Sequence, residues 1–486
     1  MRSHVAARAS SRCLHRAKPP SYVVIQVAQN ATVSQASSSY GAPGYDADIP
    51  PPSILSKPTA SQNRSRYDPD MFWRKVRPFR NVNATEFLST RWQRQFKVNT
   101  QAKLEAFINE AVPEVLPPSK DPKQRHIRTK GDFIDDIIQG MPKAGMNIGL
   151  TPYFLSIIDW TNPLGDPVLR QCLPQKSLQL PDHPMSMLDS LSEKADSPFE
   201  GLVHRYPHKI LFLAATTCPS YCVGCTRSYA VGPHTDLVNK SRPRQGRRAW
   251  QRAFDYIHEH PEIADVVVSG GDTYELQPEH LREIAESLFA IPHINRFRFA
   301  TRGLSFMPMR ILDPQDGWAR AVIDITRKGR ELGKEVAVHT QFNHPHEISW
   351  VTEEAARLLF KEGVIVRNQT VLGRGINDNV ETMGALIRGL ADINFKPYYV
   401  YQADMVQFTE HMRTPLSTIL RLEKELRGTI AGHCIPHFVV DLPGGGGKRL
   451  AQSYERYENG VAEYISPVLK YKSEKPDVYK YYDPLA

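Results

Sequence analysis

From residue 208 onwards, short apolar runs alternate along the chain with stretches whose apolar residues recur at helical spacing. Six of these runs have the length and composition of strands, namely Ile210–Thr217, Ala264–Ser269, Arg296–Thr301, Val336–Phe342, Val364–Leu372 and Pro397–Gln402. The helical stretches between and after them are Pro278–Ile291, Thr352–Glu362, Glu381–Asp392 and Leu416–Arg427. The alternation predicts a parallel α/β sheet with right-handed crossovers, as a barrel, a partial barrel or an open doubly wound sheet.

The chain before residue 208 has a different character. Residues 1–45 contain several arginines, many Ser and Ala and no Asp or Glu, which is typical of a mitochondrial transit peptide or of a leader without a targeting role. A Pro/Ser-rich linker follows, and further on helices are expected at Ala102–Ala111 and Phe133–Gly140. We therefore divide the chain into a leader and linker (1–66), an N-terminal helical region (67–200), the α/β domain (201–465) and a C-terminal tail (466–486).

Charge and hydropathy argue against two classes of protein. The 486 residues carry a net charge of +9, but residues 1–66 hold eight Lys or Arg against two Asp and account for +6 of it. The remainder has one short basic cluster, Lys240–Arg248, without interleaved aromatic residues, so we expect no nucleic-acid partner. The mean hydropathy is −0.42 and no apolar run has the length of a membrane span, so we expect no membrane association.

Three of the six cysteines, Cys218, Cys222 and Cys225, lie directly after the first predicted strand with C-x3-C-x2-C spacing. A closed zinc site or a simple electron-transfer cluster normally uses four ligands. Three thiolates can instead hold a four-iron cluster and leave one iron open to a small molecule. The spacing resembles that of the radical S-adenosylmethionine superfamily, in which the open iron binds the amino and carboxylate groups of the cofactor. The alternative is a zinc knuckle completed by His204, His208 or His234.

Two further motifs contain glycines next to a reactive group. Gly270, Gly271 and Asp272 follow the second strand; alone they indicate a turn, but after the cysteine loop they fit a site for the methionine end of S-adenosylmethionine. Four glycines precede Lys448 in a sequence that is not a phosphate-binding Walker loop, because Arg449 stands where Ser or Thr is required. A lysine held this way can form a Schiff base with pyridoxal phosphate, although Gly-Gly-Lys in isolation is more often a surface loop.

Together these motifs resemble the lysine 2,3-aminomutase family over roughly residues 145 to 465. Further matching segments include Leu150–Tyr153, His204–Pro207, His339–Pro345, Arg374–Asp378 and Pro397–Gln402. The resemblance implies a parallel (β/α)6 partial TIM-type barrel of the radical S-adenosylmethionine type, preceded by the N-terminal helical region. It also implies a [4Fe-4S] cluster, S-adenosyl-L-methionine and pyridoxal 5′-phosphate as cofactors.

The resemblance also assigns roles to individual residues. Lys448 matches the lysine that binds pyridoxal phosphate covalently, and Arg205, Tyr206 and Lys209 match the anchor of that cofactor, with Lys209 replacing an arginine. Gly270, Gly271, Asp272 and Gln369 are assigned to cofactor binding, and Cys218, Cys222 and Cys225 to the cluster. Arg227 matches the residue that pairs with the substrate carboxylate, and Asp404 and Asp441 match the two carboxylates that receive the side-chain ammonium of lysine.

This sequence departs from the family pattern at several positions. Gly224 and Gln341 each replace a histidine near the expected adenosyl site, and Ser228 begins a less basic run after Arg227. The C-terminal cysteine cluster that binds zinc in some members is absent, and Asn379 occupies its partner position, so we expect no zinc.

These observations predict a radical aminomutase that converts L-lysine to β-lysine. The alternatives are the same chemistry on another basic amino acid or on a protein lysine, and a non-catalytic iron–sulfur or zinc-binding protein on a decayed scaffold. We expect a low-potential electron donor as partner and a homo-oligomer. The expected location is the mitochondrial matrix, or the cytoplasm if the leader is not a targeting signal.

Overall fold

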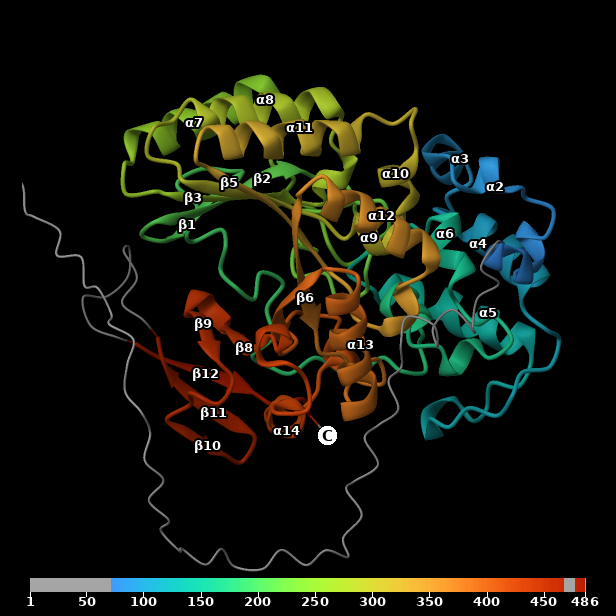
Figure 1. Cartoon of the computed structure of the whole chain (residues 1–486). Helices are drawn as coiled ribbons and strands as arrows, with labels where there is room; N and C mark the ends of the chain where they lie inside the picture. The colour runs from blue at the N-terminus through green and yellow to red at the C-terminus, as the bar shows by residue number, and fades with distance from the viewer. Residues whose placement is uncertain (1–70, 467–476, 486) are drawn as a thin grey trace, which may run out of the picture. The chain divides into compact units, whose positions relative to one another are not determined.

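The computed structural model describes residues 71–466 and 477–485, and its centre is a sheet of nine strands that lie in chain order from β1 to β9 (Figure 1). All six predicted strands are present and parallel to one another. They are β2 (Lys209–Ala215), β3 (Asp265–Gly270), β4 (Arg296–Ala300), β5 (Glu335–Thr340), β6 (Ile365–Val371) and β7 (Lys396–Tyr401). The predicted parallel α/β class is therefore confirmed.

The predicted count of six parallel strands is not confirmed, because β8 (His437–Leu442) adds a seventh. One antiparallel strand flanks each side of the parallel part: β1 (Leu202–Tyr206) beside β2, and β9 (Gly447–Leu450) beside β8. The two outer strands approach each other, since a Cβ on Gly447 would lie 3.4 Å from the Tyr206 hydroxyl. The sheet is thus curved into a nearly closed barrel.

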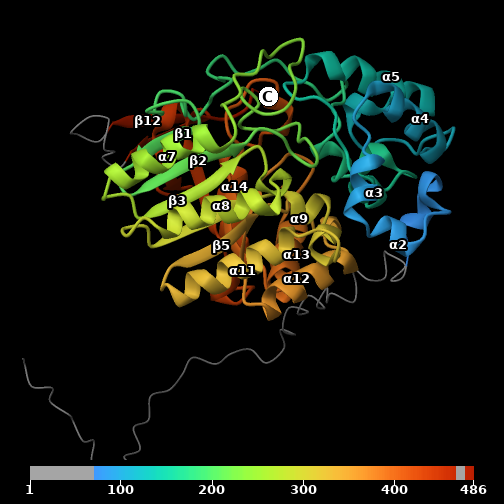
Figure 2. The ribbon, with the colours of Figure 1, turned by 90° about the horizontal axis from the view of Figure 1, so that it is seen from above.

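Helices cover the outer face of this sheet, with α7, α8 and α11 side by side over its first strands (Figures 1 and 2). The main helices are α7 (Arg247–Glu259), α8 (Pro278–Phe289), α11 (Trp318–Glu331), α12 (Trp350–Lys361), α13 (Val380–Asp392) and α14 (Leu416–Leu426). Short helices α9 (Gly303–Phe306) and α10 (Met309–Leu312) follow β4. The four predicted helices correspond to α8, α12, α13 and α14, whereas α7 and α11 were not predicted.

The two faces of the sheet differ in chemistry. Val266, Val268, Phe297 and Phe299 are at most 1% exposed and belong to one core cluster with the apolar residues of α8 and α11. Side chains alternate between the faces along each strand, so the neighbouring positions line the interior of the barrel. According to the strand pairing, this inner face carries Lys209, Ser269, Arg298, His339, Gln369, Tyr401, Asp441 and Lys448. The polar interior is therefore the candidate site.

The N-terminal region packs against the barrel through a shared core. Its helices are α2 (Ala84–Phe87), α3 (Thr90–Gln95), α4 (Gln101–Ala111), α5 (Lys130–Gly140) and α6 (Pro152–Ser156), and α4 and α5 confirm the two predicted helices. Trp73 stacks on Phe87 with ring centroids 4.2 Å apart, and both belong to the core cluster that continues into the barrel. The Tyr153 hydroxyl reaches the hydroxyls of Ser349 and Thr352 at 2.7 and 2.9 Å.

A small antiparallel sheet follows the barrel, made of β10 (Arg456–Glu458), β11 (Val461–Ile465) and β12 (Val478–Tyr482). Strand β12 lies within the segment that we assigned to a C-terminal tail. The predicted leader and linker fall outside the described residues. Among the residues that the structure describes, no helix combines the length and apolarity needed to cross a membrane.

Candidate active site

The three predicted cluster cysteines lie on the loop that leaves β2, and segments of the N-terminal region hold this loop in place. The Tyr221 amide donates to the Gly149 carbonyl at 2.9 Å, the Val223 amide donates to the Gln171 carbonyl at 2.8 Å, and Lys97 donates to the Cys218 carbonyl at 3.1 Å. The N-terminal region thus fixes the backbone that carries the three thiols.

The donors available at this loop fit an iron–sulfur cluster better than a single ion. Within the described ranges, no three His, Cys, Asp or Glu side chains are arranged to hold one metal ion. One histidine proposed to complete a zinc knuckle is engaged elsewhere: His204 is fully buried, with one ring nitrogen 3.0 Å from the Tyr256 hydroxyl and the other 3.3 Å from the Pro207 carbonyl. In a four-iron cluster each thiolate binds a different iron, so three thiolates need not converge on a single point.

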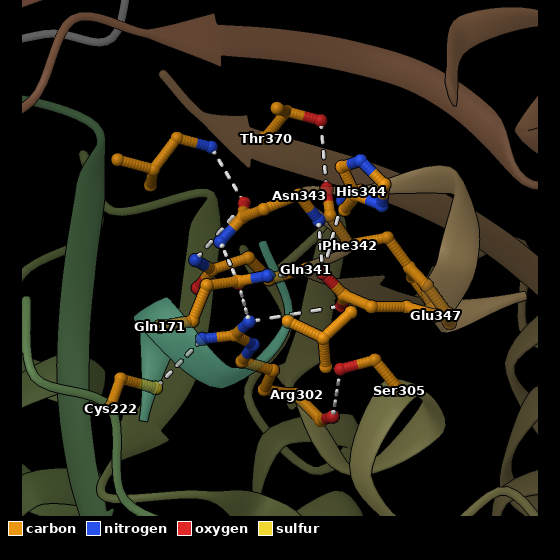
Figure 3. A network of polar contacts seen from close by, with 12 residues as sticks. Gln171, Cys222, Arg302, Ser305, Gln341, Phe342, Asn343, His344, Glu347 and Thr370 are labelled. Atoms are coloured by element: carbon orange, nitrogen blue, oxygen red, sulfur yellow. Dashed lines mark hydrogen bonds and ion pairs between the residues drawn. The ribbon is translucent and has the colours of Figure 1, made fainter. Parts of the chain in front are cut away.

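A buried polar network connects this loop to the ends of β4 and β5 (Figure 3). Arg302 donates to the Cys222 sulfur at 2.8 Å and to the Gln171 side chain, and lies 3.7 Å from Glu347. Glu347 is fully buried and accepts at one oxygen from Gln171 (2.9 Å) and from the amides of Asn343 (3.1 Å) and His344 (3.0 Å). A single arginine therefore bridges a candidate cluster ligand and a buried carboxylate.

The surroundings make the three thiols unequal. The hydrogen bond with Cys172, and then the nearby Arg302, lower the pKa of the Cys222 thiol to about 6 despite its burial. Burial, together with the nearby Cys222, raises the pKa of Cys225 to about 11. Burial also raises the pKa of Cys218, so Cys222, which accepts from Arg302, is the one of the three whose surroundings favour the thiolate.

The Gly270–Asp272 segment lies against the end of β2. A Cβ on Gly270 or Gly271 would lie 2.1 Å from the Ala215 carbonyl oxygen or 2.4 Å from that of Thr217, so both positions require glycine. Asp272 accepts from the amides of Tyr274 and Arg302, each at 2.7 Å, and burial raises its pKa to about 7. Asp272 therefore links the segment after β3 to the segment after β4. Its contact with the ammonium group of a cofactor stays a prediction.

Two of the positions that depart from the family pattern, Gly224 and Gln341, lie against neighbouring side chains. A Cβ on Gly224 would lie 3.3 Å from the Met412 sulfur, so Met412 takes up space that a side chain at position 224 would need. Gln341 donates to the Asn343 side chain at 3.4 Å and joins the network shown in Figure 3.

On the inner face, Lys448 of β9 pairs with Asp441 of β8 at 2.5 Å, and its ammonium lies 5.5 Å from the centre of the Tyr401 ring. Against the effect of burial, the Asp441 carboxylate raises the pKa of the Lys448 ammonium well above its usual value. The glycine loop that precedes Lys448 turns between the two antiparallel strands, with φ of 73° at Gly444 and 82° at Gly447. The loop therefore places an amine inside the barrel, not on the surface.

Asp404, three residues beyond the end of β7, adds a second carboxylate to this interior. Burial and the nearby Asp441 raise the pKa of Asp404 to about 8. One buried oxygen of Asp404 and one of Asp441 have no hydrogen-bond partner in the described part of the chain. The structure thus brings together three of the predicted residues, Lys448, Asp441 and Asp404, in a site with two acceptors left for a cationic ligand.

The three residues predicted to anchor pyridoxal phosphate lie on β1 and at the start of β2. Arg205 is held by Asp196 and by the Leu191 carbonyl. The Lys209 ammonium lies 4.0 Å from the centre of the Tyr206 ring, and burial, with the nearby Lys448, lowers its pKa to about 8. Lys209 keeps a cation in the barrel interior, close to the reactive lysine.

The predicted carboxylate-binding Arg227 has an acidic partner that the sequence did not reveal. Glu193 is 4% exposed and accepts from Arg227 at 2.8 and 2.9 Å and from the Tyr229 hydroxyl at 2.8 Å. Arg227 also donates to Ser269 on the inner face at 3.4 Å. No motif marks Glu193, because it lies in an irregular segment and meets Arg227 only in the folded protein.

Gln369, predicted to contact a cofactor, belongs to an aromatic part of the same interior. It accepts from the Tyr401 hydroxyl at 2.9 Å, and its amide nitrogen lies 3.3 Å from the His339 ring. Burial, with the nearby Arg298, lowers the pKa of His339 to about 2. The His339 ring beside Gln369 is therefore neutral.

Comparison of the sequence with known proteins shows that the chain is similar to aminomutases. The chain is 33% identical over 412 residues to the L-lysine 2,3-aminomutase of Clostridium subterminale, which covers 82% of this chain and 89% of that protein. It is 36% identical over 334 residues to the L-lysine 2,3-aminomutase of Fusobacterium nucleatum (66% and 74% covered) and 34% identical over 299 residues to the glutamate 2,3-aminomutase of Clostridioides difficile (62% and 66% covered). No family model matches the chain.

The structure of Streptococcus suis SuiB bound to precursor peptide SuiA covers 46% of each chain at a TM-score of 0.32 and 11% identity, a likeness that carries no argument. The relatives named above come from bacteria, so they do not support the predicted mitochondrial location. The extent of the first match nevertheless settles the family: the chain belongs to the lysine 2,3-aminomutase family and is an isomerase.

Proposed function

We propose that the protein converts L-lysine to β-lysine. The observation that carries this proposal is the group of Lys448, Asp441 and Asp404 in the barrel interior, where one ammonium faces two carboxylates. An amino acid with a cationic side chain would supply the positive charge that the second carboxylate lacks. The side chain of glutamate would instead add a third negative charge there.

The amine of Lys448 has to leave Asp441 to react with a carbonyl group. At that point Asp441 would lose its cation, and the raised pKa of Asp404 shows how unfavourable a second negative charge beside it is in this poorly solvated site. The side-chain ammonium of a lysine substrate would supply the positive charge that Lys448 no longer provides. Asp441, which now holds Lys448, and the nearby Asp404 would therefore select the substrate.

The residues present also fit the three cofactors that this chemistry needs. Cys218, Cys222 and Cys225 would hold a four-iron cluster, and Gly270, Gly271, Asp272 and Gln369 would contact S-adenosylmethionine. Lys448, Arg205, Tyr206 and Lys209 would hold pyridoxal phosphate, whose phosphate group suits the cations on β1 and β2. When bound, the cluster and S-adenosylmethionine supply a carbon radical, and pyridoxal phosphate holds the migrating nitrogen. Arg227, oriented by Glu193, would bind the substrate carboxylate.

The test is turnover by the full-length chain, reconstituted anaerobically with iron and sulfide and supplied with dithionite, S-adenosylmethionine and pyridoxal phosphate. We expect β-lysine from L-lysine and no β-product from L-glutamate. Asp404→Asn should abolish the reaction, whereas Asp392→Asn, at an exposed end of α13, should leave it unchanged. Cleavage of S-adenosylmethionine without β-lysine would show that the substrate is another one, with L-arginine tested next.

The role of Lys448 can be tested separately from turnover. Lys448→Arg keeps a cation beside Asp441 but cannot form a covalent adduct with an aldehyde, because arginine stays protonated. We expect the absorbance of the pyridoxal phosphate adduct to disappear while the iron–sulfur absorbance remains. A borohydride-stable adduct in Lys448→Arg would contradict this assignment.

A further inference from the structure

A second charged cavity lies outside the barrel interior, between the N-terminal region and the loops that follow β6 and β7. It has a volume of about 220 Å³. Three cations, Lys123, Arg170 and Arg374, line it against one carboxylate, Asp121, which pairs with Arg170 at 3.5 Å. Two positive charges are thus in excess. The cavity suits a ligand with negative charge.

Two other observations support an anionic occupant. Gln175, which also lines the cavity, is 2% exposed, and its side-chain nitrogen has no hydrogen-bond partner in the described ranges. Burial and the nearby Arg170 and Arg374 lower the pKa of His411 to about 4. The cavity therefore combines a positive field with a buried donor that an acceptor group could satisfy.

The cavity is close to the cysteine loop on two sides. Met412 lines the cavity and also packs on Gly224, the residue before Cys225. Leu173 lines it as well, and the preceding residue, Cys172, is hydrogen-bonded to Cys222. Met412 and Leu173 therefore connect the cavity to the cysteine loop. Since Lys123 is exposed, the cavity is also accessible from solvent.

We propose that this cavity is the docking site of a small acidic electron-carrier protein, which binds by charge complementarity and passes electrons towards the cluster past Met412. The inference rests on the proposed function, because it requires a cluster at Cys218, Cys222 and Cys225. In each transfer the carrier loses one electron and the cluster gains one. A carboxylate of the carrier would enter the cavity between Arg170 and Arg374 and meet the free donor of Gln175.

The test uses full-length protein loaded with the cluster and, as probe, a flavodoxin in its hydroquinone form. Cluster reduction is followed by anaerobic stopped-flow absorbance, without substrate. Lys123→Glu reverses a charge on an exposed residue and should slow reduction by about tenfold at low ionic strength, and less in high salt. Lys123→Gln should give a smaller effect. Reduction by dithionite, which needs no docking, should be unchanged in both variants.

The matched control is Lys396→Glu, which reverses an exposed charge at the first residue of β7, the opposite end of the strand from the cysteine loop. It should reduce at the wild-type rate. Equal rates for Lys123→Glu and wild type at low salt, or equal slowing by Lys396→Glu, would overturn the docking site while leaving the proposed function intact. Failure of the wild type to take up a reducible cluster would instead refute the proposed function, and the docking site with it.

Discussion

Replacement of Arg302 by methionine is expected to destabilise the protein severely, for reasons that Figure 3 makes visible. The arginine is 8% exposed in its side chain and its ionic partner Glu347 is fully buried, so Arg302→Met leaves a carboxylate in the interior without its cation. Removing one partner of a buried ion pair typically costs about 3–5 kcal/mol. Glu347 would keep three hydrogen bonds, from Gln171, Asn343 and His344, so we expect a loss of roughly 3 kcal/mol in the free energy of unfolding.

Urea denaturation of the cofactor-free protein, followed by tryptophan fluorescence, measures this effect in a double-mutant cycle. Glu347→Gln should also destabilise, and the double variant should cost less than the sum of the two single variants by about 1–3 kcal/mol. Arg310→Met provides a comparison, because Arg310 is also buried and paired with a carboxylate, Asp316, but is not hydrogen-bonded to the cysteine loop. Additivity of Arg302→Met and Glu347→Gln to within roughly 0.5 kcal/mol would refute the reasoning.

Three further predictions concern single residues. Because the pKa of Asp404 is raised in the folded protein, its contribution to stability is present below about pH 4 and is lost as the pH rises to about 8. Asp404→Asn should therefore flatten the decline in the free energy of unfolding between these pH values, measured by urea denaturation. Glu193→Gln should lower the free energy of unfolding by about 3 kcal/mol in urea, because Arg227 loses its buried carboxylate; an effect below about 1 kcal/mol would show that the pair is not needed. Gly270→Ala should prevent folding, as judged by soluble yield and circular dichroism, whereas Gly246→Ala, with a similar φ but open space around it, should fold at a cost of about 1 kcal/mol.

The main strands and helices of the barrel could be predicted because their apolar residues recur with the period of each element. Strand β8 was missed because its apolar residues run directly into the glycine loop and were interpreted as part of that motif. Helix α7 was missed because its first two residues, Arg247 and Arg248, belong to the basic cluster. The outer strands β1 and β9 have only five and four residues, too few for a periodic pattern to stand out.

The candidate site shows the same division between local and long-range information. The cysteine loop and Lys448 were found because their spacing is local. Glu193 and the Arg302 network could not be found, because their partners lie far away in the sequence: Gln171 and Arg302 are separated by 131 residues. Buried polar partners of this kind depend on the tertiary fold, which no local pattern encodes.

The order of the strands has a consequence for synthesis of the protein. The cysteine loop follows the second strand of the sheet and Lys448 belongs to the ninth, so the ribosome makes the thiols more than two hundred residues before the reactive lysine. At about 5–20 residues per second, that interval is on the order of 10–45 s. During this time the growing sheet has an unpaired edge and three thiols whose neighbours from β4 onwards do not yet exist. The incomplete barrel therefore needs protection from aggregation and thiol oxidation while it is being made. We expect cluster insertion after β9 has completed the sheet.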